Sequence, residues 1–159
     1  MNILIISDTH GNMNLLSSVL EANIDCDTVI HLGDNYGDLA NFKNLLEEKT
    51  VYKVPGIYHP DYLNGKLAPD KLIEIDNKKI LQVHSKNDIC KEADLYLFGH
   101  THDWEISNSK KGIFLNPGHL REKTEKGRTA SYALMEITHD KFHIRLLDFK
   151  HNKFLEATI

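Results

Sequence analysis

Hydrophobic and polar residues follow one another in ordered blocks along the first part of the chain. Short apolar runs rich in β-branched residues stand at 2–7, 28–32 and 50–54, and such runs are typical of buried β-strands. Between them, apolar residues recur at helical spacing, once over 15–20 and once over 39–46. This order predicts a βαβαβ unit, in which parallel strands are joined by right-handed crossovers and helices cover the sheet.

Strand signals dominate the second part of the chain. Turn-forming residues separate pairs of strand-like runs, which predicts hairpins and therefore added antiparallel strands. The predicted hairpins span residues 71–83, 105–115 and 130–149, and one more buried strand spans residues 94–98. The turn of the last hairpin is expected at residues 138–140. The fold class is therefore α/β, with two sheets packed face to face and helices outside.

Composition narrows the classes of protein that the chain can represent. It has 159 residues, with 19 lysines and arginines against 23 aspartates and glutamates, and a formal net charge of −4. This length predicts one domain over residues 1–159, and the acidic balance argues against binding to duplex nucleic acid or a membrane surface. The apolar start ends at Asp8, too early for a signal peptide or membrane span. Two cysteines, Cys26 and Cys90, suit a reducing, cytoplasmic setting.

The chain has ten histidines, and several of them follow predicted strands together with aspartates. Because the carboxyl ends of parallel strands meet at one edge of a sheet, these side chains are expected to share a rim. Asp8 and His10, two positions apart, would lie on the same side of an extended chain. Imidazole and carboxylate together suit Mn, Zn, Fe or Ni more than Mg or Ca. The candidate ligands are Asp8, His10, Asp34, His84, His100 and His102.

Each of these motifs has an ordinary explanation when it stands alone. An Asp-x-His after a strand is commonly a turn with a helix cap, a Gly-Asp pair is a common loop, and a His-x-His pair is more often solvated than ligating. Their joint occurrence at strand ends favours the metal site. Six candidate ligands exceed the needs of one tetrahedral structural ion, whereas two ions bridged by a carboxylate would use them all.

The motifs Asp8-x-His10, Gly33-Asp34, His84 and Gly99-His100-x-His102, in this order, resemble those of the calcineurin-like metallophosphoesterases. The short chain and the segment Asn116-Pro117-Gly118 are most similar to the small phosphodiesterase branch, which shares its fold with the retromer scaffold subunit. The resemblance covers residues 1 to about 137. It implies a four-layer α-β-β-α sandwich of two mixed sheets that carries two metal ions. By this resemblance the first ion would be held by Asp8, His10 and His102, the second by His84 and His100, and both by Asp34.

One position departs from the family pattern. The family places Gly-Asn after its third strand, and the Asn binds the second ion, whereas this chain has Gly56-Ile57. Ile57 has no donor atom. His59 is a candidate replacement ligand or proton donor to the leaving group, and Tyr58 is a candidate contact to substrate. The alternative is an ordinary surface loop shaped by its prolines. The departure predicts a weaker second metal site.

The function expected from these residues is metal-dependent hydrolysis of a small phosphoester, most of all a phosphodiester. Two divalent transition metal ions, with Mn favoured, would bridge a hydroxide that attacks phosphorus. The candidate catalytic residues are Asp34, as bridging ligand, and His59. A close alternative has one tightly bound ion and a weak second site. The alternative of another class is a non-catalytic protein-interaction module on the same fold, and an exposed edge of the second sheet would allow a homodimer.

Three further features lie near these motifs without a fixed role. His31, inside a predicted strand, is expected to be packed or to support the ligands. His119 follows the Asn-Pro-Gly segment and is a candidate for contacting the substrate or supporting the ligands. A basic run then follows, which is usually solvated but next to a phosphate site would hold an anionic substrate. It contains Arg121, Lys123, Lys126 and Arg128.

Overall fold

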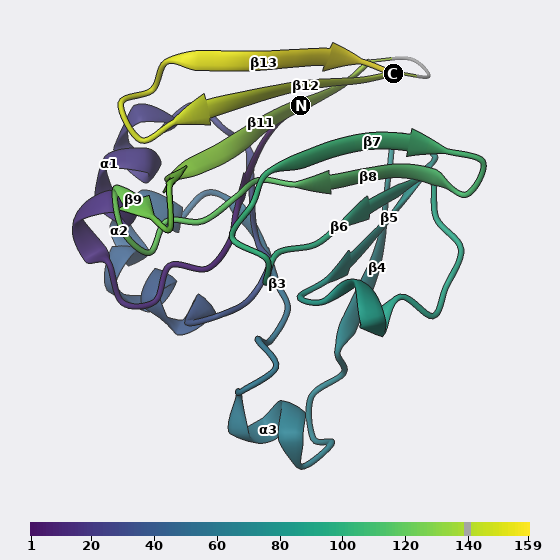
Figure 1. The fold of residues 1–159 in the computed structure, drawn as a ribbon, viewed down its shortest axis with the longest axis horizontal. Coiled ribbons are helices and arrows are strands. Elements are labelled where there is room, and N and C mark those ends of the chain that lie inside the picture. Colours follow the sequence, from purple (N-terminus) through teal and green to yellow (C-terminus); the bar gives the residue numbers. More distant parts are fainter. Residues whose placement is uncertain (139–140) are drawn as a thin grey trace.

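The computed structural model of the protein describes residues 1–138 and 141–159, so the hairpin turn predicted at His139-Asp140 lies outside the described residues. Its strands form a six-stranded sheet in the order β13-β12-β11-β1-β2-β3, a five-stranded sheet in the order β4-β5-β6-β8-β7, and a two-stranded ribbon of β9 and β10. Figure 1 shows the two large sheets side by side, with the ribbon and the helices around them. This arrangement confirms the predicted α/β class with two mixed sheets.

The predicted βαβαβ unit forms the first half of the six-stranded sheet. Strands β1 (Asn2–Ile6), β2 (Thr28–His31) and β3 (Thr50–Lys53) are parallel, and α1 (Met13–Ala22) joins the first two. The side chain of Asn12 caps α1 by accepting a hydrogen bond from the amide of Leu15.

The second predicted helix is only partly α-helical. Residues Tyr36–Phe42 form a 3₁₀-helix, η1, and one α-helical turn, α2 (Lys43–Leu46), follows it. The residue before η1, Asn35, is left-handed with φ of 65° and makes no side-chain capping bond. The Asp38 amide donates to the Asn35 carbonyl at 2.8 Å, three residues back, which is the hydrogen-bond spacing of a 3₁₀-helix.

The last predicted hairpin extends the six-stranded sheet. Strand β11 (Ser131–Thr138) lies antiparallel to β1, followed by β12 (Lys141–Asp148) and β13 (Lys153–Thr158). The sequence analysis missed β13. Its residues are half-buried or exposed because it is the edge strand, so it has no continuous apolar run to reveal it.

The other two predicted hairpins build the five-stranded sheet. Strands β4 (Asp70–Ile75) and β5 (Lys78–Val83) form one, and β7 (Glu105–Ser109) and β8 (Gly112–Asn116) form the other. Strand β6 (Leu95–Leu97) lies between them and is parallel to both neighbours, β5 and β8. The sheet is therefore mixed, not purely antiparallel, and the ends of β5 and β6 point to the same edge.

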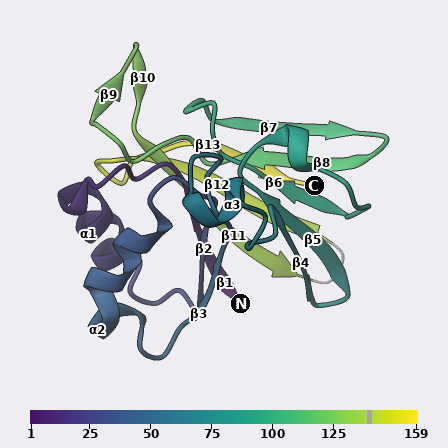
Figure 2. The ribbon, with the colours of Figure 1, turned by 90° about the horizontal axis from the view of Figure 1, so that it is seen from below.

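The core lies between the two sheets and is made mainly of branched aliphatic residues such as Ile5, Leu97 and Ile144, all fully buried. Figure 2 shows α1 and α2 on the outer side of the six-stranded sheet, away from the other sheet. The outer face of the five-stranded sheet is covered more thinly, by one 3₁₀ turn, η2 (Lys86–Asp88), and by Ile89. No helix within residues 1–138 and 141–159 has the length and apolar character needed to cross a membrane.

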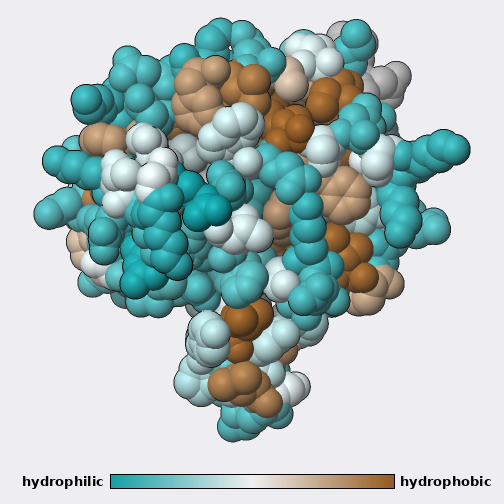
Figure 3. All heavy atoms as spheres, viewed as in Figure 1, coloured by the Kyte–Doolittle hydropathy of each residue, from teal (hydrophilic) through white to brown (hydrophobic). Residues whose placement is uncertain are grey.

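Two short excursions leave this sandwich near its functional edge. After β3 the chain forms α3 (Pro60–Leu63), which Figure 1 shows apart from the sheets and Figure 3 shows as a lobe with apolar atoms on its surface. Leu63 on this lobe is 68% exposed. After β8, the basic run forms a projecting ribbon of β9 (Thr124–Glu125) and β10 (Arg128–Thr129).

Candidate metal centre

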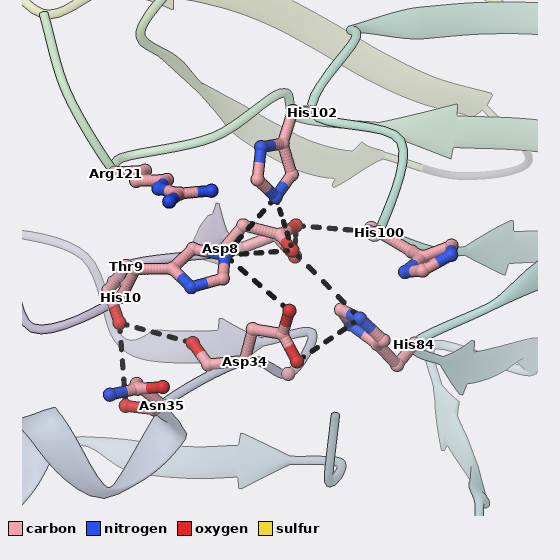
Figure 4. Close-up of polar contacts among 12 residues, drawn as sticks. Asp8, Thr9, His10, Asp34, Asn35, His84, His100, His102 and Arg121 are labelled. Atoms are coloured by element: carbon pink, nitrogen blue, oxygen red, sulfur yellow. Dashed lines mark hydrogen bonds and ion pairs between the residues drawn. The ribbon is translucent and has the colours of Figure 1, made fainter. Parts of the chain in front are cut away.

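Imidazoles and carboxylates from both large sheets meet where the strands end (Figure 4). One ligand atom from each of Asp8, His10, Asp34 and His102 lies within 4.8 Å of the others. His84 joins them from β5, with its Nε2 atom 3.4 Å from Asp34 Oδ1 and 3.9 Å from Asp8 Oδ1. The structure therefore brings together five of the residues that the sequence proposes as ligands.

The backbone turns sharply at these positions. The extended conformation assumed for Asp8 and His10 is wrong, because both residues are left-handed, as are three other candidate ligands. The φ angles are 53° for Asp8, 45° for His10, 46° for Asp34, 69° for His100 and 58° for His102. A non-glycine residue in this region costs on the order of 1–3 kcal/mol, and such residues cluster at functional sites. The left-handed backbone at these five residues is therefore strained, and it directs their side chains toward one another.

Asp8 is fully buried and its two carboxylate oxygens have different surroundings. Oδ2 accepts hydrogen bonds from the Ser7 hydroxyl at 2.5 Å and the His100 amide at 3.0 Å. Among the residues that the structure describes, Oδ1 has no hydrogen-bond partner, although His102 Nε2 is 3.2 Å away. Burial raises the pKa of the Asp8 carboxyl, but His102, His84 and Ser7 outweigh it and leave the pKa below its usual value. Asp8 is therefore a buried carboxylate with one unsatisfied oxygen.

His84 presents a second unsatisfied atom to the same space. Its Nδ1 atom is 2.7 Å from the Leu32 carbonyl and donates its hydrogen there, so Nε2 carries the lone pair. The ring is fully buried, and Nε2 has no hydrogen-bond partner among the described residues. The neighbouring backbone is close: a Cβ on Gly33, where φ is +100°, would lie 2.5 Å from His84 Nδ1. His84 is thus fixed in the tautomer that a metal ligand needs.

His102 lies between two carboxylates. Its Nε2 faces Asp8 and is also 3.2 Å from His10 Nε2, while its Nδ1 contacts the carboxylate of Glu125 on β9. Asp8 raises the pKa of the His102 imidazole, with Glu125 acting in the same direction against burial. Burial lowers the pKa of His10, and it outweighs the opposing effect of the carboxylates of Asp34 and Asp8.

His100 and His59 do not belong to this closely spaced group. His100 reaches Asp8 through its backbone amide, and its imidazole is exposed, with its ring 5.2 Å from that of His84. His59 caps α3, because its Nδ1 accepts a hydrogen bond from the Asp61 amide at 3.1 Å. Its ring stacks on Tyr36, and its Nε2 is 3.4 Å from the Tyr36 hydroxyl.

The loop after β3 nevertheless touches the cluster at Gly56. A Cβ on this glycine would lie 1.9 Å from Asp34 Oδ1 and 2.7 Å from the Asp34 amide nitrogen. Ile57 follows, half-buried, and Tyr58 is 75% exposed. The chain therefore passes beside Asp34 where the family has its Asn, and it brings no donor side chain at residue 57.

Several supporting residues surround the ligands. His31 is fully buried, its Nε2 is 3.2 Å from the Thr9 hydroxyl, and burial lowers its pKa to about 3. His119 stands beside His102, with ring centroids 5.4 Å apart. Asp38 accepts hydrogen bonds from the Thr9 hydroxyl at 2.7 Å and the Gly11 amide at 2.8 Å, which holds the turn after β1 in place.

Sequence reasoning missed Asp38 and Glu125. Asp38 lies in η1 and Glu125 in the ribbon, and each is separated from its partner by more than twenty residues. Neither stands at the end of a predicted strand, which was the signal used to select ligands. Only the three-dimensional fold brings them to the cluster.

The donor set fits a divalent cation. Buried polar atoms without hydrogen bonds are uncommon in folded proteins and costly, on the order of 1–3 kcal/mol each. Here Asp8 Oδ1 and His84 Nε2 are both of this kind and both face the centre of the cluster. A cation among these residues would satisfy both atoms.

The comparisons with known proteins agree with this geometry. Residues 1–140 match the family model of the calcineurin-like phosphoesterase superfamily domain. The chain is 28% identical over 167 aligned positions to a protein of Bacillus subtilis named probable metallophosphoesterase YsnB, covering 96% of this chain and 94% of that protein.

Solved structures give the same result. A Streptococcus pneumoniae protein described as a predicted phosphoesterase has a TM-score of 0.73 at 25% identity, covering 99% of this chain and 96% of that one. The Vps29 of Entamoeba histolytica complexed with zinc has a TM-score of 0.70 at 19% identity, covering 100% and 98% of the two chains, and so shares the fold. The family model, the curated relative and the shared fold together show that this chain belongs to the calcineurin-like phosphoesterase superfamily.

Proposed function

We propose that the protein is a metal-dependent phosphodiesterase whose ions are held by the clustered carboxylates and imidazoles. The observation that carries the proposal is the pair of buried, unsatisfied ligand atoms, Asp8 Oδ1 and His84 Nε2, which lie 3.9 Å apart beside the carboxylate of Asp34. A bound cation would give both atoms a partner, and metal-assisted hydrolysis needs such a cation. The proposed ligands are Asp8, His10, Asp34, His84, His100 and His102.

Two ions fit this donor set, with Asp34 shared between them. Its carboxylate has one oxygen toward each group of imidazoles: Oδ2 is 3.5 Å from His10 Nε2, and Oδ1 is 3.4 Å from His84 Nε2. We assign Asp8, His10 and His102 to the first ion, and His84 and His100 to the second. The mixture of nitrogen and oxygen donors favours Mn, Ni, Zn or Fe, and among these we favour Mn.

The residues determine how a phosphodiester would react in this site. Bound divalent ions supply positive charge for the phosphoryl oxygens and acidify a water molecule. Glu125 and the Leu32 carbonyl fix His102 and His84 in orientation, so little reorganisation is needed when substrate arrives. His59 remains our candidate for protonating the leaving group, because its loop passes beside Asp34 through Gly56. That role requires its Nε2 to turn away from Tyr36.

The test is hydrolysis of an activated aryl phosphodiester by metal-free protein to which Mn²⁺ or Ni²⁺ is added. We expect activity that depends on the added metal and is lost in Asp34→Ala. An absence of metal-dependent hydrolysis, with Asp34→Ala indistinguishable from the unaltered protein, would refute the proposal. The same assay with an aryl phosphomonoester tests the narrower assignment to diesters, which predicts the faster reaction with the diester.

A non-catalytic interaction module is the second candidate function. Two observations favour it: Ile57 stands where the family has a ligand, and Leu63 exposes an apolar side chain on the projecting α3 lobe. Metal content alone does not decide between the two, because a solved Vps29 is itself described as a zinc complex. The hydrolysis assay distinguishes the two functions. A protein that binds metal but hydrolyses no phosphoester would be better explained as an interaction module.

A further inference from the structure

One carboxylate connects a candidate metal ligand to an arginine. Glu125, in the ribbon that follows β8, contacts His102 Nδ1 through Oε2 and accepts a hydrogen bond from Arg121 Nη1 at 3.0 Å through Oε1. Its side chain is 14% exposed, so the contact with His102 is partly buried, whereas the hydrogen bond from Arg121, whose side chain is 44% exposed, lies at the surface. The basic run that the sequence left without a role is thereby attached to the cluster.

The backbone at Arg121 is fixed to the turn that carries Asp8. The amide of Leu120 donates to the carbonyls of Ser7, at 3.2 Å, and Asp8, at 3.3 Å. The Arg121 carbonyl accepts a hydrogen bond from Asn12 Nδ2 at 2.8 Å. Arg121 therefore starts from a fixed point next to the cluster, and Figure 4 shows its guanidinium directed toward the imidazoles of His10 and His102.

Most of the hydrogen-bonding capacity of Arg121 remains available. A guanidinium has five N–H donors in a planar fork, and Glu125 is the one side-chain acceptor found for it within the described residues. The side chain is 44% exposed, which leaves the rest of the fork open to solvent and to a bound ligand. This fork matches the spacing of two phosphoryl oxygens, and Arg–phosphate hydrogen bonds are about twice as strong as neutral ones.

Two other basic residues of the run, Arg128 and Lys123, have different partners. Arg128 Nε pairs with Asp103 Oδ2 at 3.0 Å, and the Lys123 ammonium lies 5.9 Å from the ring centroid of Phe149. Arg128 has nearly the same exposure as Arg121, 40% against 44%. It therefore serves as a matched control for any general effect of removing a positive charge from this segment.

We propose that Arg121 binds the non-bridging phosphoryl oxygens of the substrate, and that Glu125 positions both Arg121 and His102. The inference rests on the proposed phosphoesterase function and names the residue that recognises the phosphoryl group in that site. Because the two oxygens of Glu125 hold different partners, phosphoryl recognition and metal binding are coupled through one side chain. Arg121 acts on the phosphoryl group alone.

The experiment compares the unaltered protein with Arg121→Ala, Glu125→Ala, Glu125→Gln and Arg128→Ala. Three quantities are measured: the KM for an activated aryl phosphodiester, the affinity of the Mn²⁺-loaded protein for inorganic phosphate, and Mn²⁺ affinity by competition with a chelating dye. Circular dichroism confirms that each variant is folded. Glu125→Gln keeps the shape and one acceptor oxygen, so it separates the effect of the charge from that of the volume.

Arg121→Ala is expected to weaken phosphate binding and raise KM by about tenfold to a hundredfold, while Mn²⁺ affinity stays within about twofold. Glu125→Ala is expected to weaken Mn²⁺ binding about tenfold or more and phosphate binding as well, with partial rescue in Glu125→Gln. Arg128→Ala should leave all three quantities unchanged.

Two results would overturn the inference: unchanged phosphate affinity and KM in Arg121→Ala, or an equal loss in Arg128→Ala, which would indicate a general charge effect. Failure of phosphate to bind the unaltered, metal-loaded protein would also overturn it. Phosphate binding that requires Arg121, without hydrolysis of any phosphoester, would refute the proposed function and leave the inference intact. Hydrolysis with a KM that is indifferent to Arg121 would refute the inference alone.

Discussion

The two sides of the metal cluster differ in how firmly the fold holds their ligands. On one side Asp8 is fully buried and His102 is 15% exposed, and both are fixed by hydrogen bonds from outside the cluster. On the other side His84 is equally buried, but the His100 imidazole is exposed and Ile57 offers no donor atom. The first side needs little rearrangement to take an ion, whereas the second must order an exposed imidazole. The comparison predicts two ion sites of unequal affinity with Asp34 between them.

The largest effect is expected from Asp34→Asn, which removes the charge shared by both sides. Its two oxygens face His10 and His84, so we expect hydrolysis to fall by about a thousandfold, equivalent to about 4 kcal/mol of transition-state stabilisation. Asp76→Asn is the control, because Asp76 is also a left-handed aspartate, with φ of 50° against 46°, in the exposed β4–β5 turn. Steady-state kinetics at saturating Mn²⁺ measures both. Equal activity in the two variants would contradict a shared role for Asp34.

The next largest effect is expected from Gly56→Ala, which moves Asp34 without changing its chemistry. The added methyl group would lie 1.9 Å from Asp34 Oδ1, so the carboxylate must shift. A displacement of about 1 Å in such a site can cost about a hundredfold in rate, and we expect a loss of that order with weaker Mn²⁺ binding. Gly37→Ala, where nothing lies within 4 Å of the new methyl group, should behave as the unaltered protein. Full activity in Gly56→Ala would show that Asp34 is not held as the structure indicates.

A gain is expected from Ile57→Asn, which restores a donor on the weaker side. The loop passes Asp34 at Gly56, so an amide oxygen at residue 57 would add a ligand for the second ion. We expect its apparent Mn²⁺ affinity to rise about tenfold, as for one added charge-assisted contact. Leu63→Asn, at a 68% exposed position on α3, is the control. Activity measured against Mn²⁺ concentration reports the change. If the curve for Ile57→Asn is the same as that for the unaltered protein, then Ile57 is not the reason that the second site is weaker.

The smallest effect is expected on the pH dependence of the unfolding free energy, through the buried imidazole of His31. Burial lowers the pKa of His31 from its ordinary value of 6.5 to about 3. Between these values the unfolded chain binds a proton that the folded protein does not, so the free energy of unfolding falls as pH drops below about 6.5. His31 should contribute a loss of about 1.4 kcal/mol between pH 7.5 and 5.5.

Denaturant unfolding with chelator present measures this slope. In His31→Gln the pH dependence of the unfolding free energy should be smaller, by the uptake of about one proton in the unfolded chain. An unchanged slope in His31→Gln would mean that this imidazole is not held neutral by burial.

The sequence predicted the parts of the molecule that depend on local pattern. The apolar runs at β1, β2 and β5 identified buried strands, and the polar residues directly after them proved to converge. That inference needed only the rule that parallel strands end at a common edge. The assumed geometry was wrong, because Asp8 and His10 are left-handed. Asp and His adopt this conformation more often than most non-glycine residues, but their identity alone does not say which of them will do so.

The parts that escaped prediction depend on distant contacts. Glu125 meets His102 because the ribbon folds back over the cluster, and Asp38 meets Thr9 because η1 packs against the β1 turn. The edge strand β13 is defined by its pairing with β12 and not by its own residues. The separate positions of His100 and His102 likewise follow from the turn between them.

Metal binding by these residues is tested most directly by a calorimetric titration of metal-free protein with Mn²⁺, repeated with Asp8→Asn. We expect a tight first binding event and a weaker second one, with the tight event lost in Asp8→Asn because its buried carboxylate charge has gone. No detectable binding of Mn²⁺, or binding that is unaffected by Asp8→Asn, would contradict the convergence of these residues on a metal ion.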